Sequence, residues 1–191
     1  MDKLISDLFS GLGKLLKGKV TQAVGNKTRS FSFQRLPISL EELKALPEAS
    51  LTDVYAVAAL SVLALTRFGE NREESVRMLN FLKGPDPLTP MGIQQISDRF
   101  MDGKFYKVRS FFGGATPGNN YTPAQPYTIK VSSNPYSFPE ENWATLYLES
   151  GGSDNPRPVK LRKKPSTGQW FLVEIQYLGD IRPPVAADRW A

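Results

Sequence analysis

The sequence predicts an α+β fold in which N-terminal helices pack on one face of a four- to five-stranded antiparallel meander sheet. Three observations support this prediction. Three segments near the C-terminal end alternate apolar and polar residues with a period of two and are joined by short turns. Four earlier segments begin with helix-capping residues and continue with apolar residues at helical spacing. The length of 191 residues and the hydrophobic fraction of 40% suit a single domain with a sizeable core.

The clearest strands are predicted at residues 143–149, 158–164 and 169–178. In the first of these, Ala144, Leu146 and Leu148 share one face, because every second residue of a strand points the same way. In the third, we expect the apolar residues at 171, 173, 175 and 177 to share a face. Glycine, proline, serine and asparagine fill the two connections and predict turns there.

Two weaker strands are predicted earlier in the chain. Residues 127–131 alternate as Tyr-Thr-Ile-Lys-Val, and residues 104–112 place Tyr, Val, Ser and Phe at alternate positions. Both patterns have the period of two that is typical of a half-buried strand. With the three later segments, they give a sheet of four or five strands.

The first two helices are predicted from their caps. Ser39 and Glu42 form a capping box, so a short helix begins there and ends before Pro47. Ser50 or Thr52 caps a second helix that runs to about residue 67. This second segment is apolar nearly all round, which is typical of a buried helix. We therefore expect it at the centre of the core.

The next two helices have equally clear ends. Asn71 with Glu74 caps a third helix, and Gly84 followed by proline ends it. Thr89 caps a fourth helix with Pro90 at its first position, where proline is favoured. An Asp-Gly pair at 102–103 ends the fourth helix. The apolar stripes of both helices are interpreted as core-facing.

The N-terminal segment differs from the rest of the chain in charge and pattern. Residues 1–20 predict a basic amphipathic helix, and residues 21–35 predict a polar linker, so the single α+β domain is expected to span 36–191. Two interpretations of this helix stay open: it binds an anionic membrane surface or a protein partner, or it folds back onto the domain. Its stripe and flanking cations include Leu4, Leu8, Leu12, Leu15, Lys14 and Lys17.

Composition excludes several kinds of chemistry. The chain has no cysteine and no histidine, which excludes disulfides, thiolate metal sites, a cysteine nucleophile and a histidine base. Seven basic and two acidic residues lie in residues 1–35, so this segment carries the whole net charge of +5. The remaining residues include 17 of each sign. A neutral domain is not typical of nucleic-acid-binding proteins, and nucleic acid is the less favoured partner.

No stretch reaches the roughly 18 apolar residues of a membrane span, and the N-terminus lacks the apolar core of a signal peptide. The sequence therefore predicts a cytoplasmic protein. Phosphate-binding loops, dinucleotide fingerprints and serine-nucleophile motifs are not found. We accordingly expect no cofactor, no metal and no catalytic residue.

Two clusters are candidate binding surfaces. The first surrounds the glycine- and proline-rich segment 113–126, where aromatic residues and an arginine either line a ligand pocket or close one end of the core. Its candidate residues are Tyr106, Arg109, Phe111 and Tyr121.

The second cluster is a basic strand face. Basic residues alternate along residues 157–164 and have tryptophan and tyrosine as possible neighbours, which suits single-stranded nucleic acid. The alternative is a strand whose lysines discourage aggregation at a sheet edge. The candidate residues are Arg157, Lys160, Arg162 and Lys164.

Five segments and the terminal Asp-x-Trp-Ala carry a family resemblance. The segments are 36–53, 78–85, 114–117, 120–123 and 157–170, and the match extends over about residues 36–191. In these motifs the chain resembles a bacterial family with a domain of unknown function. That resemblance implies a cytoplasmic bacterial protein and carries no activity over. The hairpin that ends in Trp170 is also similar to the terminal hairpin of nuclear-transport-factor-like cone folds.

The leading hypothesis is a non-enzymatic binding or protein-interaction module, because no nucleophile–base pair, metal cluster or cofactor motif is found. Two alternatives remain. One is a single-stranded nucleic-acid binder that uses the basic strand at 157–164. The other is a small enzyme with a carboxylate in a cone-like pocket, and it requires a buried Asp or Glu.

Overall fold

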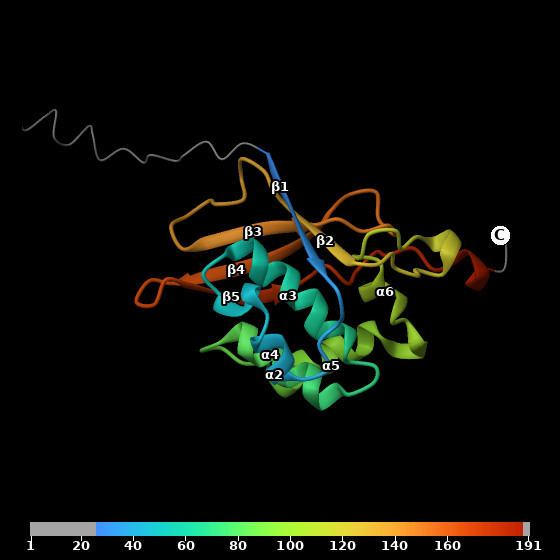
Figure 1. Cartoon of the computed structure of the whole chain (residues 1–191), viewed down its shortest axis with the longest axis horizontal. Helices are drawn as coiled ribbons and strands as arrows, with labels where there is room; N and C mark the ends of the chain where they lie inside the picture. Colours follow the sequence, from blue (N-terminus) through green and yellow to red (C-terminus); the bar gives the residue numbers. More distant parts are fainter. Residues whose placement is uncertain (1–25, 189–191) are drawn as a thin grey trace, which may run out of the picture.

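The computed structural model describes residues 26–188, which form an α+β domain with an antiparallel sheet (Figure 1), and the predicted fold class is confirmed. The helices are α2 (Leu40–Lys44), α3 (Val54–Thr66), α4 (Arg72–Lys83), α5 (Pro90–Arg99) and α6 (Tyr106–Arg109). The strands are β1 (Lys27–Phe33), β2 (Tyr127–Ser133), β3 (Trp143–Leu148), β4 (Arg157–Lys164) and β5 (Gln169–Ile175).

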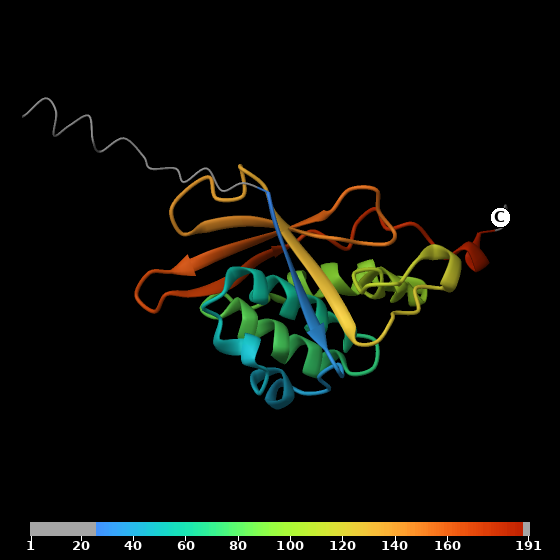
Figure 2. The same cartoon turned by 45° about the horizontal axis from the view of Figure 1, so that its top comes forward.

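The sheet has the spatial order β1-β2-β3-β4-β5, and each neighbouring pair is antiparallel. β2, β3, β4 and β5 follow one another as the predicted meander. The helices lie against one face of this sheet (Figure 2). β1 comes before the helices in the sequence and β2 comes after them, yet the two strands are neighbours in the sheet. The helices are therefore inserted between two adjacent strands.

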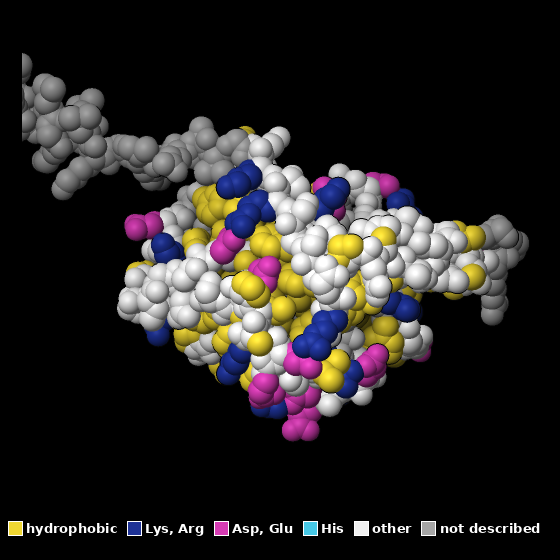
Figure 3. Space-filling view, in the orientation of Figure 1, with side chains coloured by type: hydrophobic (Ala, Val, Ile, Leu, Met, Phe, Trp, Pro, Cys, Tyr) yellow, Lys and Arg dark blue, Asp and Glu magenta, His cyan; other side chains and the backbone are white. Residues whose placement is uncertain are grey.

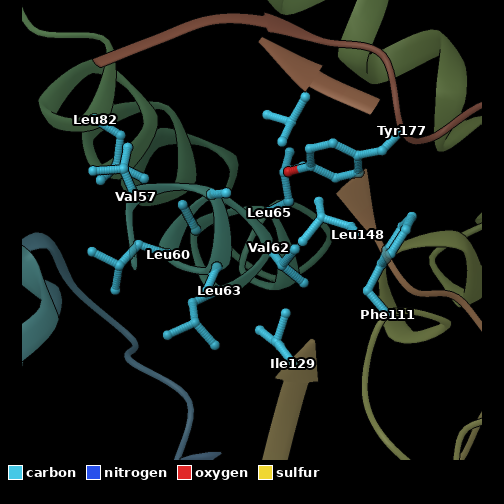
Figure 4. Close-up of a cluster of buried hydrophobic side chains, with 14 of the residues drawn as sticks. Val57, Leu60, Val62, Leu63, Leu65, Leu82, Phe111, Ile129, Leu148 and Tyr177 are labelled. Carbon is cyan, nitrogen blue, oxygen red and sulfur yellow. The ribbon is translucent and has the colours of Figure 1, made fainter. Parts of the chain in front are cut away.

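α3 forms the centre of the core. Its first twelve residues are all buried, as predicted from its apolar sequence. Four of its thirteen residues are alanines, which allow close approach of the sheet on one side and of α4 on the other. Figure 4 shows leucine and valine side chains of α3 between Leu82 of α4 and side chains that include Ile129 of β2, Leu148 of β3 and Tyr177. The sheet face that meets α3 also buries the predicted Ala144 and Leu146.

Three predicted caps are confirmed. Ser39 accepts a hydrogen bond from the backbone N–H of Glu42, and Asn71 accepts one from that of Glu74. Thr89 accepts one from Gly92, with Pro90 next to it. The predicted cap of α3 was wrong: Asp53, not Ser50 or Thr52, accepts from the N–H of Tyr55. Ser50 and Thr52 bond to each other instead.

The predicted linker at residues 21–35 is wrong over most of its described part. β1 lies within it and pairs with β2 along all seven residues. Phe31 and Phe33 are 7% and 3% exposed, and their burial explains why this polar segment is held as a strand. The alternating Phe-Ser-Phe was the missed signal, so the domain begins before residue 36. The predicted amphipathic helix at 1–20 lies outside the described residues.

The predicted strand at 104–112 is also wrong. This segment contains α6, and only Phe112 forms a bridge, to Ile129. Val108, Phe111 and Phe112 are buried together, which is the i, i+3, i+4 spacing of a helical turn. The segment is so short that its apolar residues fit both the strand period of two and the helical period of 3.6. The packing of these side chains in the core selects the helix.

The faces of β5 differ from the predicted alternation. A bulge beside the Lys160–Leu161 step of β4 shifts the register, so that Leu172 faces Leu161 and Ile175 faces Val159. Leu172 is consequently the buried residue of the strand. Trp170 is half-buried, and its indole lies edge-on to Phe138 at 6.5 Å between ring centroids.

One polar contact lies deep in this core. The hydroxyl groups of Ser61 in α3 and Tyr177 lie 2.8 Å apart, and Ser61 also donates to the carbonyl of Ala58 at 2.7 Å. Tyr177 therefore acts as the donor to Ser61. Burial raises the pKa of the Tyr177 phenol, so it stays protonated and keeps this proton to donate.

We expect removal of residues 1–35 to unfold the domain, whereas removal of residues 1–25 leaves it folded. The longer deletion removes β1 and exposes the core around Phe31 and Phe33, and deletion of a buried aromatic alone typically costs about 3–5 kcal/mol. Urea unfolding followed by circular dichroism measures the difference. Equal midpoints for the two deletions would contradict the assignment of β1 to the core sheet.

We expect Ser61→Ala to destabilise the domain by about 1–3 kcal/mol, because it leaves the buried donor of Tyr177 without an acceptor. Tyr177→Phe removes that donor, so adding it to Ser61→Ala should recover much of the loss. Urea midpoints of both single variants and the double variant complete the cycle. Additive losses would show that the two hydroxyls do not interact.

Candidate functional site

An open groove of about 740 Å³ runs between strand β5, helix α5 and the segment that joins α4 to α5. Its lining includes Val173, Glu174 and Ile175 from the edge strand of the sheet and the next residue, Gln176. The other lining residues are Lys83, Asp86, Pro87, Leu88, Thr89, Gly92, Gln95, Ile96, Asp98, Arg99 and Leu178.

The groove combines aliphatic and charged side chains. Leu88, Val173 and Ile175 are half-buried, and Ile96 is buried below them. Asp86, Asp98 and Arg99 are exposed charged residues of the same lining. The exposed lining is somewhat more polar than apolar, so a ligand here would make hydrogen bonds as well as apolar contacts, and the polar groups would fix its orientation.

Local sequence features hold the segment between α4 and α5. The backbone N–H of Leu88 donates to Asn80 Oδ1 at 2.8 Å, which ties the segment to α4. Gly84 has a positive φ of 59°, and a Cβ atom there would lie 2.3 Å from the Phe171 ring. Only glycine therefore lets α4 end this close to β5. The helix end and the strand together define one end of the groove.

Lys83 secures the same junction. Its side chain is buried at 8% exposure, and Nζ donates to the carbonyl of Val173 at 3.1 Å. This carbonyl belongs to the edge strand at its bulge. The lysine thus joins the last turn of α4 to β5, while its stem forms part of the groove wall.

Two of the three carboxylates in the groove lining have side-chain partners. Glu174 pairs with Lys160, with 3.2 Å between Oε1 and Nζ, and Asp98 accepts from Gln94 at 2.8 Å. Within residues 26–188, no group of three or more Asp, Glu, His or Cys residues is placed to hold a metal ion. The arrangement can bind a ligand by apolar contact and hydrogen bonds, and it shows no paired nucleophile and base.

A smaller groove of about 470 Å³ lies where β2 and β3 separate. These strands pair only at Val131–Leu148 and Ser132–Tyr147. Beyond that point Gly113 donates to the carbonyl of Thr128 and takes the place of the neighbouring strand. The Lys130–Glu149 ion pair, with 3.2 Å between Nζ and Oε2, is part of its lining.

The predicted aromatic cluster is brought together mainly inside the protein. Tyr106 stacks on Tyr121 at 5.5 Å, and Phe111 meets Tyr177 edge-on at 5.1 Å. Tyr121 and Phe111 are buried, whereas Arg109 is exposed. Burial also raises the pKa of Tyr121. None of these four residues is part of the lining of the two grooves described above.

Tyr121 has a specific anchoring contact. Its hydroxyl donates to the carbonyl of Arg182 at 2.6 Å, so it ties the loop at 113–126 to the C-terminal tail. This part of the molecule projects at the right of Figures 1 and 3, and on the face shown in Figure 3 it is mostly uncharged. The glycine- and proline-rich loop is therefore anchored to the tail at this point.

The basic strand is confirmed as β4, but two of its cations are paired. Arg157 lies 3.2 Å from Asp180, and Lys160 lies 3.2 Å from Glu174.

The remaining members of that cluster lie near aromatic side chains. Arg162 stacks over Trp143 at 4.9 Å. Tyr147 lies on the same face of β3, four residues after Trp143. Lys164 is exposed on this face. Trp170 is paired with Lys163 and so points to the opposite face. The face is mixed in charge along β3, β4 and β5.

Sequence reasoning missed the groove beside β5. The sequence predicted only that Val173 and Ile175 share a face of the last strand, because alternation does not show whether a helix covers the whole strand. The available signal was the Pro-Asp-Pro segment at 85–87, which keeps the chain extended between two helices. The N-terminal candidates Leu4, Leu8, Leu12, Leu15, Lys14 and Lys17 lie outside the described residues.

Comparison with known families gives one match. The family model "Domain of unknown function (DUF6935)" matches residues 35–185. The chain belongs to this family. Searches of curated proteins and of solved structures found no match for the DUF6935 chain. Among its described residues, no helix has the length and apolar character that crossing a membrane requires.

We expect the DUF6935 domain to bind single-stranded RNA or DNA only weakly, at about the 10⁻⁴–10⁻⁶ M typical of non-specific contact at physiological salt. The reason is that Arg157 and Lys160 are already paired with carboxylates. Fluorescence anisotropy with labelled oligonucleotides measures this affinity. Tight binding that is lost in the Lys160→Ala, Arg162→Ala, Lys164→Ala triple variant would instead favour the nucleic-acid alternative.

Proposed function

We propose that the DUF6935 domain is a non-enzymatic interaction module that binds an extended segment of a partner protein in the groove beside β5. The observation that carries the proposal is the run of four consecutive lining residues, 173–176, of which the first three belong to the edge strand β5. An extended peptide beside an edge strand gains affinity from main-chain hydrogen bonds and specificity from alternate side chains. A cytoplasmic location, as the sequence predicts, belongs to this proposal.

The dimensions and lining of the groove support a peptide ligand. Its volume of about 740 Å³ falls within the roughly 300–1,000 Å³ of ordinary ligand sites. Leu88, Ile175 and Val173 offer aliphatic surface for alternate side chains of such a peptide. Asp86 and Arg99 supply charges of both signs, so the favoured ligand is a mixed apolar and polar segment.

The two alternatives have less support. The small enzyme requires a buried carboxylate in its pocket, and no Asp or Glu is among the buried residues of the described range 26–188. The nucleic-acid binder requires free cations on β4, and two of the four candidates are paired. A binding role for the N-terminal helix with a protein or an anionic membrane remains a separate proposal from sequence.

The test is a peptide-display selection against the full-length protein, followed by affinity measurement of the enriched peptides by fluorescence polarisation. Gln95 lines the groove from α5, and Met91, at 72% exposure, lies on the same helix outside the groove lining. We expect Gln95→Trp to weaken binding at least about tenfold by filling the groove, which corresponds to about 1.4 kcal/mol.

The matched control is Met91→Trp, which adds the same side chain to α5 at an exposed position that is not part of the groove lining. It should leave the affinity unchanged. Selected peptides that bind Gln95→Trp as tightly as the natural protein would show that the binding site is elsewhere. A selection without any enriched peptide would count against a peptide ligand altogether.

A further inference from the structure

The two edges of the sheet are treated differently by the rest of the described chain. At β5, the backbone N–H of Trp170 donates to the carbonyl of Leu51 at 2.7 Å, and Lys83 bonds to the carbonyl of Val173. The end of α4 also lies against Phe171. This edge is therefore partly covered, and what remains open is the groove described above.

The edge at β1 has no such cover among residues 26–188. β1 is bonded to β2 over its whole length, from the Lys27–Ser133 pair to the Phe33–Tyr127 pair. Neither backbone nor side-chain hydrogen bonds from other described segments reach the backbone of residues 27–33. Half of its N–H and C=O groups point away from β2, as on every edge strand, and they are free to pair with another strand.

The residues of β1 suit pairing with a second copy of the same strand. An antiparallel pair about a two-fold axis at Ser30 places Ser30 opposite its own copy and Thr28 opposite Ser32. These three side chains are exposed and carry hydroxyls, and Thr–Ser pairs across strands are favourable. The same register places Arg29 opposite Phe31 of the other copy. No like charges meet in this register.

The charges that normally protect an edge strand are largely occupied at β1. Arg29 is held by Asp53 at 2.5 Å, and its guanidinium stacks over Phe31 at 5.1 Å. Lys27 lies over the ring of Tyr55 at 5.6 Å. A solvated lysine or an inward-pointing charge discourages pairing between edges, whereas Arg29 is bound to Asp53 of its own chain, and the exposed Lys27 lies at the end of the strand and not at its centre.

We propose that two copies of this protein associate through β1, in antiparallel register centred on Ser30, to form one continuous sheet. The isologous pairing satisfies the free backbone groups of both strands at once. It leaves the two grooves beside β5 at the opposite ends of the combined sheet. The dimer is independent of the proposed peptide function, and it would make that function bivalent.

A single engineered cysteine tests the register, because the chain contains no cysteine of its own. Residues directly opposite in an antiparallel pair have Cα atoms about 4.5–5.5 Å apart, within the range of a disulfide. Ser30→Cys in the full-length protein should therefore give a disulfide-linked dimer under mild oxidation.

Thr28→Cys is the matched control. In the proposed register the two substituted positions are offset by four residues, or about 13 Å, and should not cross-link. The double variant Thr28→Cys, Ser32→Cys brings each new thiol opposite one on the other copy and should cross-link again. This pattern is specific to the register and is not expected from random collision.

Sedimentation velocity over a concentration series tests the association without any disulfide. Ser30→Glu places two carboxylates opposite each other at the two-fold axis, while Lys130 opposite Ser30 in the same chain favours the folded monomer. We expect the dimer dissociation constant to rise at least about tenfold. A natural protein that stays monomeric overturns the proposal, as does equal cross-linking of the Ser30→Cys and Thr28→Cys variants.

A monomeric full-length chain whose residues 26–191 alone dimerise would show that the N-terminal residues cover β1 instead. That result also overturns the proposal for the natural protein. Peptide binding in the groove is measured separately, so failure of one proposal leaves the other to be judged on its own data.

Discussion

The structure depends on the burial of one helix, α3, between the sheet and α4. Its twelve buried residues leave no polar face, so the helix is stable only when both sides are covered. The alanines of α3 let the neighbouring elements come close to it. A hydrogen bond between the hydroxyls of Ser61 and Tyr177 joins α3 to the segment that follows β5. The positions of the sheet and of α4 follow from this constraint.

The groove beside β5 is a consequence of how α4 meets the sheet. α4 packs against α3 and ends at Gly84, where the absence of a Cβ lets Phe171 lie against the backbone. The chain then turns through Pro85 and Pro87 before α5 begins. α5 is held away from β5 by this segment, so the aliphatic surface of Val173 and Ile175 is only half covered.

The ion pairs of β4 join it to neighbouring segments and do not form within the strand. The cations of β4 alternate on one face, but their partners Glu174 and Asp180 come from β5 and the tail. Pairing of this kind is worth little to stability at an exposed surface, since solvent screens it. Its larger effect is to place negative charge beside two cations of β4, so that this face is mixed in charge.

The sequence by itself determined the α+β class, the meander from β2 to β5 and the caps at Ser39, Asn71 and Thr89, because these features depend on local periodicity and on hydrogen bonds between near neighbours. It also placed α3 at the centre of the core, since a helix without a polar face has no other stable position. The family membership, too, is a property of the sequence alone.

Only the tertiary structure decided the rest. The burial of Phe31 and Phe33 in the core stabilises a strand in a segment that is otherwise polar. Residues 104–112 contain α6 because Val108 and Phe111 pack inward. The bulge in β5 reverses the expected face of Leu172. The groove beside β5 and the open edge of β1 depend on the arrangement of elements that are far apart in the chain. A local sequence pattern does not indicate which strands lie at the edges of a sheet.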